Sequence, residues 1–485
     1  MRLRCMSMSD VQVPTSLRSS QTAERDAAPL AVSGAWGDAA ARAGDLPLTP
    51  GVAQVLRRST DRDLRLPSAA ARESAHPKRI LVYSHDTFGL GNIKRMLEIS
   101  KHLVAAYSNV SVLIISGSPM VHAFRIPPRI DYIKLPCLAR TLDGAYDVKF
   151  LGVGYEDTIR LRATLITSAL LDFSPDLILV DKKPFGVGNE LAPALRLLHG
   201  RGALPKVVLL LRDILDNPET TTATWERNHY HEAVRCFYDR ILVVGSPEIF
   251  NLATEYKFPA STGSKLQFCG YLRRDRGSQT RDQIRGELGV HDDERLVLVT
   301  GGGGEDGYQL LANYVHGLSH IPRGTKIKTL LICGPEMSEQ DRRRIRLAAA
   351  HPGLVIQEFN NDMMGCIDAA DLVVSMAGYN TICEILSLRK RAIVVPRVRP
   401  VQEQWMRAER LAQLGVLRSL HPDHVTPTKL ISAVTEELNA DHGESQKAYK
   451  VDLDGMSRVV SSLYALLDDS APIAATSPIA ATSMI

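Results

Sequence analysis

The sequence predicts an α/β fold made of two doubly wound, Rossmann-like domains. Short β-branched runs alternate with helical stretches, which is typical of βαβ units and parallel sheets. Two sets of about five runs are separated by a break at 270–274, whereas a single eight-stranded barrel needs evenly spaced units. The first set covers 79–84, 110–116, 176–181, 206–211 and 240–245, and the second covers 296–300, 328–333, 354–357, 371–375 and 392–395.

Composition differs between the ends of the chain and its middle. The first 76 residues are rich in Ala, Ser, Arg and Asp and show no sustained period, so they cannot bury enough apolar surface to offset their ordering entropy. The far end repeats Pro-Ile-Ala-Ala-Thr-Ser at 472–477 and 478–483. We therefore expect a disordered leader (1–76), a first domain (77–270), a second domain (271–440), a C-terminal helix (441–468) and a flexible tail (469–485).

Several classes of protein are disfavoured by composition. The chain has 485 residues, of which 45% are hydrophobic, and its 58 Lys and Arg against 54 Asp and Glu leave a net charge of +4. Bulk attraction to nucleic acid is not indicated by so small a charge. No apolar run approaches the ~18 residues of a membrane span. The seven cysteines are scattered and form no CxxC pair, which favours a reducing, cytoplasmic setting.

The first strand is followed by a loop, 84–92, that contains Gly89 and Gly91. Its glycines are not spaced as GxGxxG, which disfavours a dinucleotide site. His85 and Asp86 are the only adjacent titratable pair at a strand end in this region, and such a pair can accept a proton from a hydroxyl. The alternative is structural, with Asp86 capping a turn and His85 hydrogen-bonded in the core.

Four successive glycines, 301–304, follow the first strand of the second domain and lead into a helix. Backbone N–H groups left uncovered at a helix N-terminus form an anion site. No Lys-Ser/Thr follows, so the loop is not that of an ATP-hydrolysing enzyme. We therefore expect this loop to bind phosphate.

A further turn follows the strand at 371–375 and presents Thr381 and Glu384 on the first turns of a helix. A carboxylate there can accept two hydrogen bonds from vicinal hydroxyls, as a ribose offers. The alternative is that Glu384 only complements the helix dipole. After the next strand, Glu403 and Gln404 suit sugar hydroxyls, or else form a solvated helix start.

Cationic side chains follow two strands of the first domain, at Lys182, Lys183 and Arg212. They can contact an acceptor or a phosphate. An internal pair between Arg212 and Asp213 that holds a loop is an equally good interpretation.

Taken in order, the motifs of the second domain resemble the C-terminal half of GT-B glycosyltransferases, above all the bacterial family that makes lipid II from UDP-N-acetylglucosamine. The matching segments are 301–304, 358–363, 370–384 and 396–404. The loop 84–91 resembles that of a group of predicted glycosyltransferases in the same superfamily. The resemblance covers roughly 78–440 and implies two Rossmann-like domains facing a central cleft.

The resemblance also implies roles for individual residues. Segment 358–363 would contact the uracil, and Glu384 would bind the ribose hydroxyls. A glycine-lined turn and an arginine would bind the pyrophosphate, and a polar helix start would contact the donor sugar. The implied donor-binding residues are Gly302, Gly303, Arg274, Phe359, Asn360, Gly378, Asn380, Thr381, Glu384, Glu403 and Gln404.

One position on the acceptor side departs from the family. The acceptor-side loop comprises Gly89, Gly91 and Asn92, and many relatives have a histidine where this chain has Asn92. An amide cannot act as a base, so we expect His85 and Asp86 to be the catalytic substitutes.

The implied activity is transfer of a hexosyl or N-acetylhexosaminyl group from a UDP-sugar to a hydroxyl acceptor. We expect inversion at the anomeric centre, with no cofactor and no metal. The alternatives are a non-hydrolysing UDP-sugar 2-epimerase and an inactive nucleotide-sugar-binding protein. The acceptor, the hexose, the oligomeric state and a peripheral membrane contact through an apolar patch are left open.

Overall fold

The computed structural model describes residues 77–86, 90–140, 146–200, 205–322, 324–349, 351–440 and 451–468. The predicted leader 1–76 and tail 469–485 lie outside the described residues, as does Gly89. Among the described helices, none is both long and apolar enough to cross a bilayer.

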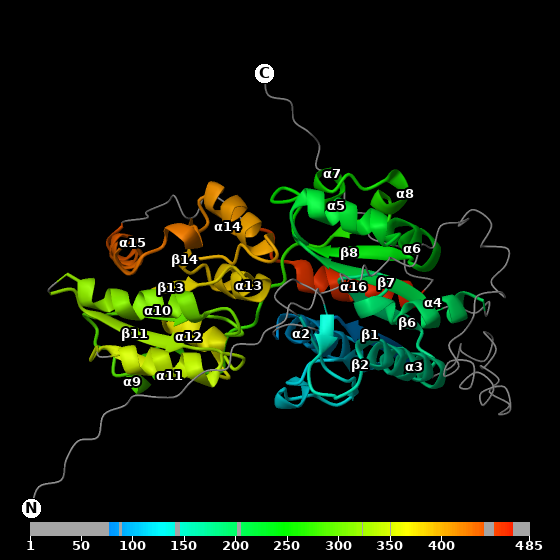
Figure 1. Cartoon of the computed structure of the whole chain (residues 1–485), viewed down its shortest axis with the longest axis horizontal. Coiled ribbons are helices and arrows are strands. Elements are labelled where there is room, and N and C mark those ends of the chain that lie inside the picture. The colour runs from blue at the N-terminus through cyan, green and yellow to red at the C-terminus, as the bar shows by residue number, and fades with distance from the viewer. Residues whose placement is uncertain are drawn as a thin grey trace, which may run out of the picture. The chain divides into compact units, whose positions relative to one another are not determined.

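The first domain is built on a parallel sheet of seven strands in the order β3-β2-β1-β6-β7-β8-β9. Its strands β1, β2, β6, β7 and β8 are labelled in Figure 1. A separate antiparallel ribbon joins β4 to β5. The strands are β1 (Lys78–Ser84), β2 (Val110–Ser116), β3 (Ile130–Lys134), β4 (Leu138–Arg140), β5 (Tyr146–Val148), β6 (Leu177–Asp181), β7 (Lys206–Arg212), β8 (Arg240–Val244) and β9 (Leu266–Phe268). The helices are α2 (Gly91–Ala106), α3 (Tyr155–Phe173), α4 (Ala192–His199), α5 (Pro218–Arg227), α6 (Tyr230–Phe237), α7 (Leu252–Glu255) and α8 (Ala260–Gly263).

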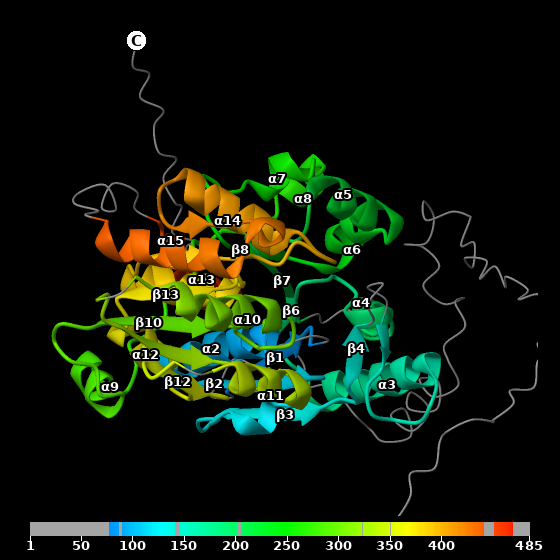
Figure 2. The same ribbon diagram turned by 60° about the vertical axis from the view of Figure 1, so that its left-hand side comes forward.

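The second domain is built on a parallel sheet of six strands in the order β12-β11-β10-β13-β14-β15. Its strands β10, β12 and β13 are labelled in Figure 2. The strands are β10 (Arg295–Thr300), β11 (Ile327–Ile332), β12 (Leu354–Gln357), β13 (Leu372–Ser375), β14 (Ala392–Val394) and β15 (Arg418–Ser419). The helices are α9 (Arg281–Glu287), α10 (Tyr308–Gly317), α11 (Glu339–Ala348), α12 (Met363–Ala369), α13 (Tyr379–Leu388), α14 (Glu403–Gln413) and α15 (Pro427–Asn439).

Helices cover both faces of each sheet, which explains why the central strands are apolar nearly throughout. Along β1, Ile80 and Val82 point into one core and Leu81 and Tyr83 into another, because successive side chains of a strand alternate between faces. The first core contains side chains of α2, and the second contains side chains of α3 to α6. In the second domain, α10, α11 and α15 cover one face, whereas α9, α12, α13 and α14 cover the other.

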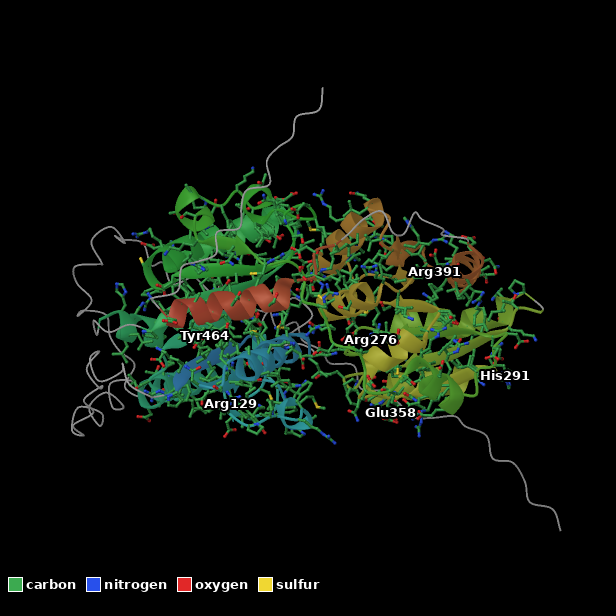
Figure 3. The ribbon with its side chains drawn as sticks, turned by 180° about the vertical axis from the view of Figure 1, so that it is seen from behind. Arg129, Arg276, His291, Glu358, Arg391 and Tyr464 are labelled. Atoms are coloured by element: carbon green, nitrogen blue, oxygen red, sulfur yellow. The ribbon has the colours of Figure 1, made fainter. Side chains whose placement is uncertain are left out.

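The last described helix, α16 (Gly455–Leu467), packs against α2 and strands β6 to β8 of the first domain. Tyr464 of α16 (Figure 3) stacks on Tyr107, with ring centroids 3.5 Å apart. Segment 451–454 also meets the chain between the two domains, where Tyr271 donates its N–H to the carbonyl of Asp452. Residues 451–467 therefore belong with the first sheet in space, although the second domain precedes them in sequence.

All ten predicted strands are present, with ends shifted by at most one residue. Sequence reasoning missed β3, β9 and β15, which lie in the two sheets, and the β4–β5 ribbon. These elements are short or lie at a sheet edge, so they lack a continuous apolar run. The physical reason is that an edge strand needs no apolar side chain at every position.

Candidate functional site

Two loops of the second domain leave the same edge of its sheet. Strands β10 and β13 are hydrogen-bonded neighbours, and Thr300 is in register with Ser375 at their carboxyl ends. A Cβ atom placed on Gly302 would lie 4.0 Å from the Thr381 hydroxyl oxygen. The glycine-rich loop 301–304 therefore faces the first turn of α13, which is the juxtaposition that the predicted phosphate site requires.

Two glycines of this loop have left-handed backbones for different reasons. Gly304 has φ +96°, and a Cβ there would lie 2.6 Å from the carbonyl oxygen of Cys333, so only glycine fits. Gly302 has φ +67°, is exposed, and would place a side chain in open space before Thr381. Gly304 is therefore required by packing, whereas Gly302 keeps the space in front of α13 open.

The glycine loop leaves fewer backbone N–H groups uncovered than the sequence suggested. Gly301 donates to the carbonyl of Ile332, and Gly304 donates to the carbonyl of Gly301. Gly302 donates to the Thr300 hydroxyl at 3.1 Å. No acceptor among the described residues bonds the N–H of Gly303.

The N-terminus of α13 is the better anion site. Its N-cap residue is Gly378, and no side chain caps the helix. Free first-turn N–H groups and the helix dipole both favour a bound anion. Asn380 and Thr381 lie in this turn, as the sequence predicted.

Arg274 lies against the same helix. Its backbone N–H donates to Ser387, and its Nη2 donates to the Asn380 carboxamide oxygen at 2.8 Å. The side chain is buried, yet its Nε and Nη1 have no partner among the described residues. A buried guanidinium with unpaired N–H groups is costly, and a phosphate would satisfy them.

Glu384 lies on α13, one turn after Asn380, and is buried. Its carboxylate does not stand free, because the ammonium group of Lys94 lies 2.5 Å away. Lys94 belongs to α2 of the first domain, and the Asn380 amide also donates to the carbonyl of Gly91 at 2.9 Å. Sequence reasoning missed Lys94, whose only signal was a cation in the first turn after the loop 84–92.

Glu403 and Gln404 are buried at the start of α14, so a solvated helix start is wrong for both. Burial alone would raise the pKa of Glu403, but the charges of Arg212, Arg407 and Arg397 outweigh it and lower that pKa to about 2. The Gln404 carboxamide oxygen accepts from the N–H of Arg397 at 3.1 Å. These contacts hold the segment that joins β14 to α14, while a role in reading the donor sugar stays a prediction.

Arg407 forms a buried, bidentate ion pair with Asp213, with both N–O distances at 2.7 Å. It also donates to Glu403 at 2.9 Å. Arg212 pairs with Glu403 at 3.4 Å, so the internal Arg212–Asp213 pair weighed from the sequence is wrong. Arg407 gave no signal because it resembles any polar residue of an amphipathic helix.

The loop after β12 carries the predicted uracil contacts. The side chain of Asn360 donates to Gln357 at 2.9 Å and accepts from the N–H of Asp362 at 2.7 Å. Phe359 is half exposed. The Asn360 side chain thus fixes the shape of the loop, and contact with uracil through the backbone stays a prediction.

The predicted catalytic pair of the first domain is buried. Burial raises the pKa of Asp86 to about 6, although hydrogen bonds from Ser116 and Ser84 oppose the rise. Burial also lowers the pKa of His85 well below 6.5, and the nearby charges of Lys182 and Lys183 lower it further. His85 therefore remains neutral at physiological pH, whereas Asp86 can exchange a proton at a pH close to the physiological range.

Asn92, which stands where relatives have histidine, forms hydrogen bonds to His85 and Arg95. Its amide group donates to the carbonyl of His85, and its carbonyl accepts from Arg95 at 3.1 Å. Arg95 in turn pairs with Asp181 at 2.6 Å, and both side chains are fully buried. Asn92 is thus a structural residue that holds the turn in which His85 and Asp86 lie.

Comparison with known families matches residues 296–462 to the glycosyltransferase family 28 C-terminal domain. The match begins at β10 and runs through the second domain into α16, so this part of the chain is similar to the C-terminal domain of that family. An uncharacterized glycosyltransferase of Methanopyrus kandleri is 25% identical over 160 residues, which is 33% of this chain and 42% of that protein. The UDP-N-acetylglucosamine–N-acetylmuramyl-(pentapeptide) pyrophosphoryl-undecaprenol N-acetylglucosamine transferase of Bacteroides fragilis is 31% identical over 117 residues, 24% of this chain and 30% of that one. The chain thus spans less than half the length of both relatives.

Solved structures extend the likeness from the family 28 domain to the whole fold. Acinetobacter baumannii MurG has a TM-score of 0.51 at 15% identity, covering 80% of this chain and 99% of that one. A putative UDP-N-acetylglucosamine 2-epimerase from Listeria monocytogenes has a TM-score of 0.54 at 13% identity, covering 82% and 98%. The predicted fold class, two Rossmann-like domains of the GT-B type, is confirmed. Since a transferase and an epimerase are both similar, the fold alone does not choose between the two activities.

Proposed function

We propose that this protein is a glycosyltransferase that moves a hexosyl or N-acetylhexosaminyl group from a UDP-sugar to a hydroxyl acceptor. The observation that carries the proposal is the position of Gly302 opposite Thr381 on the uncapped first turn of α13. Glu384 follows within one turn, and Arg274 offers unpaired N–H groups beside it. The family 28 match and the similarity to the N-acetylglucosamine transferase of Bacteroides fragilis support a UDP-linked donor.

In this proposal the second domain binds the donor. The diphosphate lies at the N-terminus of α13 and against the guanidinium of Arg274, while Glu384 accepts hydrogen bonds from the ribose hydroxyls. Such preorganised donors typically contribute about 3–4 kcal/mol each to stabilising a developing negative charge. They would take the place of a metal ion at the departing diphosphate, and attack from the opposite face of the sugar would invert the anomeric centre.

The first domain supplies the base in this scheme. A general base works best when its pKa lies near the operating pH. Asp86, with a pKa of about 6, fits that requirement better than His85, whose pKa is well below 6.5. We therefore assign the proton transfer to Asp86 and an orienting role to His85, whose Nε2 lies 3.4 Å from the hydroxyl oxygen of Tyr146.

The proposal is tested by thermal unfolding of the full chain with UDP-, GDP-, dTDP- and ADP-sugars. A donor present at 100 times its dissociation constant adds ~2.7 kcal/mol to the free energy of unfolding, and we expect this only for UDP-sugars. Turnover is then followed with and without hydroxyl acceptors, in the presence of EDTA. Conversion of the donor without any acceptor would identify a 2-epimerase, and binding without turnover over a broad acceptor panel would identify an inactive binding protein.

A peripheral membrane contact also stays a prediction, and the structure indicates where to test it. Of the seven large exposed apolar side chains among the described residues, five lie within 150–165 of the first domain. They include Phe150, Leu161 and Leu165, the last two one turn apart on α3. We expect Leu161→Glu to reduce flotation with lipid vesicles. Leu347→Glu on α11 should leave flotation unchanged, although Leu347 is 81% exposed and Leu161 only 45%. Equal flotation of both variants and the wild type would contradict a contact through this segment.

A further inference from the structure

The ion pair between Lys94 and Glu384 joins the two domains at the proposed ribose site. The Lys94 ammonium lies 2.5 Å from the Glu384 carboxylate, and the two residues are 290 positions apart in the sequence. A second contact lies beside it, from the Asn380 amide to the carbonyl of Gly91. The first turn of α2 is therefore held over the first turns of α13.

The two partners differ in their surroundings. The Glu384 side chain is 5% exposed, whereas that of Lys94 is 36% exposed. Among the described residues, Lys94 is the cation that pairs with this carboxylate. Hydroxyl groups that donate to Glu384 must therefore compete with an ammonium group for the same oxygen atoms.

Lys94 is able to leave Glu384 without leaving the site. A lysine carries its charge on a flexible four-carbon stem, so the ammonium group can turn while the helix stays in place. The first turn of α13, where the diphosphate is proposed to lie, is one turn away from Glu384 on the same helix. A bound diphosphate would attract the ammonium group that the ribose hydroxyls release.

We propose that Lys94 is a donor-binding residue that exchanges partners, from Glu384 in the empty site to the donor diphosphate in the loaded site. This inference rests on the proposed function and adds a contact from the first domain to a donor otherwise bound by the second. The exchange makes the phosphate groups of the donor necessary for tight binding. A nucleoside without phosphates has to displace Lys94 and offers it no new partner.

The test compares the affinities of UDP and uridine, measured by calorimetric titration of the full chain. We expect Lys94→Met to strengthen uridine binding and to weaken UDP binding, so that the ratio of the two affinities changes about tenfold or more. Lys94→Arg keeps the charge and should retain UDP binding. Lys101→Met is the matched control, because Lys101 lies on the same helix and pairs with Glu98 rather than with the second domain.

The outcomes separate this inference from the proposed function. Suppose that the wild type binds UDP, and that Lys94→Met leaves the ratio of the UDP and uridine affinities unchanged or weakens the binding of both ligands equally. The partner exchange is then overturned, while the donor site stands. If the wild type binds neither ligand, the donor site is overturned and the inference with it. Thermal midpoints of all variants, measured alongside, test whether the lysine substitutions leave the fold intact.

Discussion

Asp86 of the first domain and Glu403 of the second are both buried carboxylates beyond a strand end, yet their pKa values shift in opposite directions. Asp86 is hydrogen-bonded by the Ser116 hydroxyl at 2.6 Å, and burial raises its pKa to about 6. Glu403 lies among three arginines, whose charges lower its pKa to about 2. Burial is common to both, so the difference comes from the presence of cationic partners.

This contrast separates two kinds of site. A carboxyl group with a pKa near 6 can take up and release protons, which is what an acid–base role on the acceptor side requires. A carboxylate held ionised by arginines stays charged at physiological pH and anchors the structure around it. In the proposed function, the first domain would therefore supply proton transfer, and the second would supply fixed charge and hydrogen bonds for the donor.

The largest expected effect comes from removing Arg407, which pairs with Asp213 of the first domain and Glu403 of the second. Arg407→Ala leaves Asp213 and Glu403 buried without their principal partner, and breaking a buried ion pair from one side costs about 3–5 kcal/mol. Urea unfolding measures the loss. Arg410→Ala on the same helix is the control, because its exposed pair with Glu255 is worth about 1 kcal/mol or less. Equal losses in the two variants would contradict an anchoring role for Arg407.

A smaller effect, with a defined pH dependence, is expected at Asp86. The native state holds the Asp86 proton up to about pH 6, whereas the unfolded chain releases it near pH 3.8, so this group lowers stability as pH rises through that window. Asp86→Asn should therefore raise the free energy of unfolding by about 2–3 kcal/mol above pH 6 and by almost nothing below pH 4. Glu403→Gln should show the opposite sign, with a loss that shrinks as pH falls from 4.5 toward 2.

The same Asp86→Asn variant also tests whether Asp86 takes part in catalysis, when its turnover is measured. If Asp86 is the base, turnover falls sharply although the protein becomes more stable at neutral pH. Donor affinity should stay unchanged, because Asp86 is not among the residues proposed to bind the donor. Full turnover by this variant would show that Asp86 has only a structural role.

Much of the fold could be predicted because parallel strands covered on both faces leave long apolar runs in the sequence. The facing of loop 301–304 and α13 also followed, since both motifs come directly after strands of one sheet. The partners of the site residues could not be predicted. Glu384 meets Lys94 across 290 positions, and Arg407 meets Asp213 across 194. Such pairs depend on how separate elements pack, which no local pattern in the chain encodes.

Asn92 shows a second kind of limit. The sequence indicated that the histidine of relatives is missing, and chemistry alone showed that an amide is no base. The hydrogen bonds of Asn92 to His85 and Arg95 could not be predicted, because an asparagine after a glycine has many equally ordinary local roles.

The most direct test of the central claim is a titration of UDP against two valine variants that carry the same backbone strain. Gly302 and Gly415 have φ of +67° and +68°, and neither Cβ would meet an atom closer than 4 Å. Each substitution should cost about 1–3 kcal/mol of stability for a left-handed residue. We predict that Gly302→Val weakens UDP binding at least about tenfold, because its side chain enters the space before Thr381, whereas Gly415→Val binds UDP as the wild type does. Undiminished affinity in Gly302→Val would contradict the placement of the diphosphate between this loop and α13.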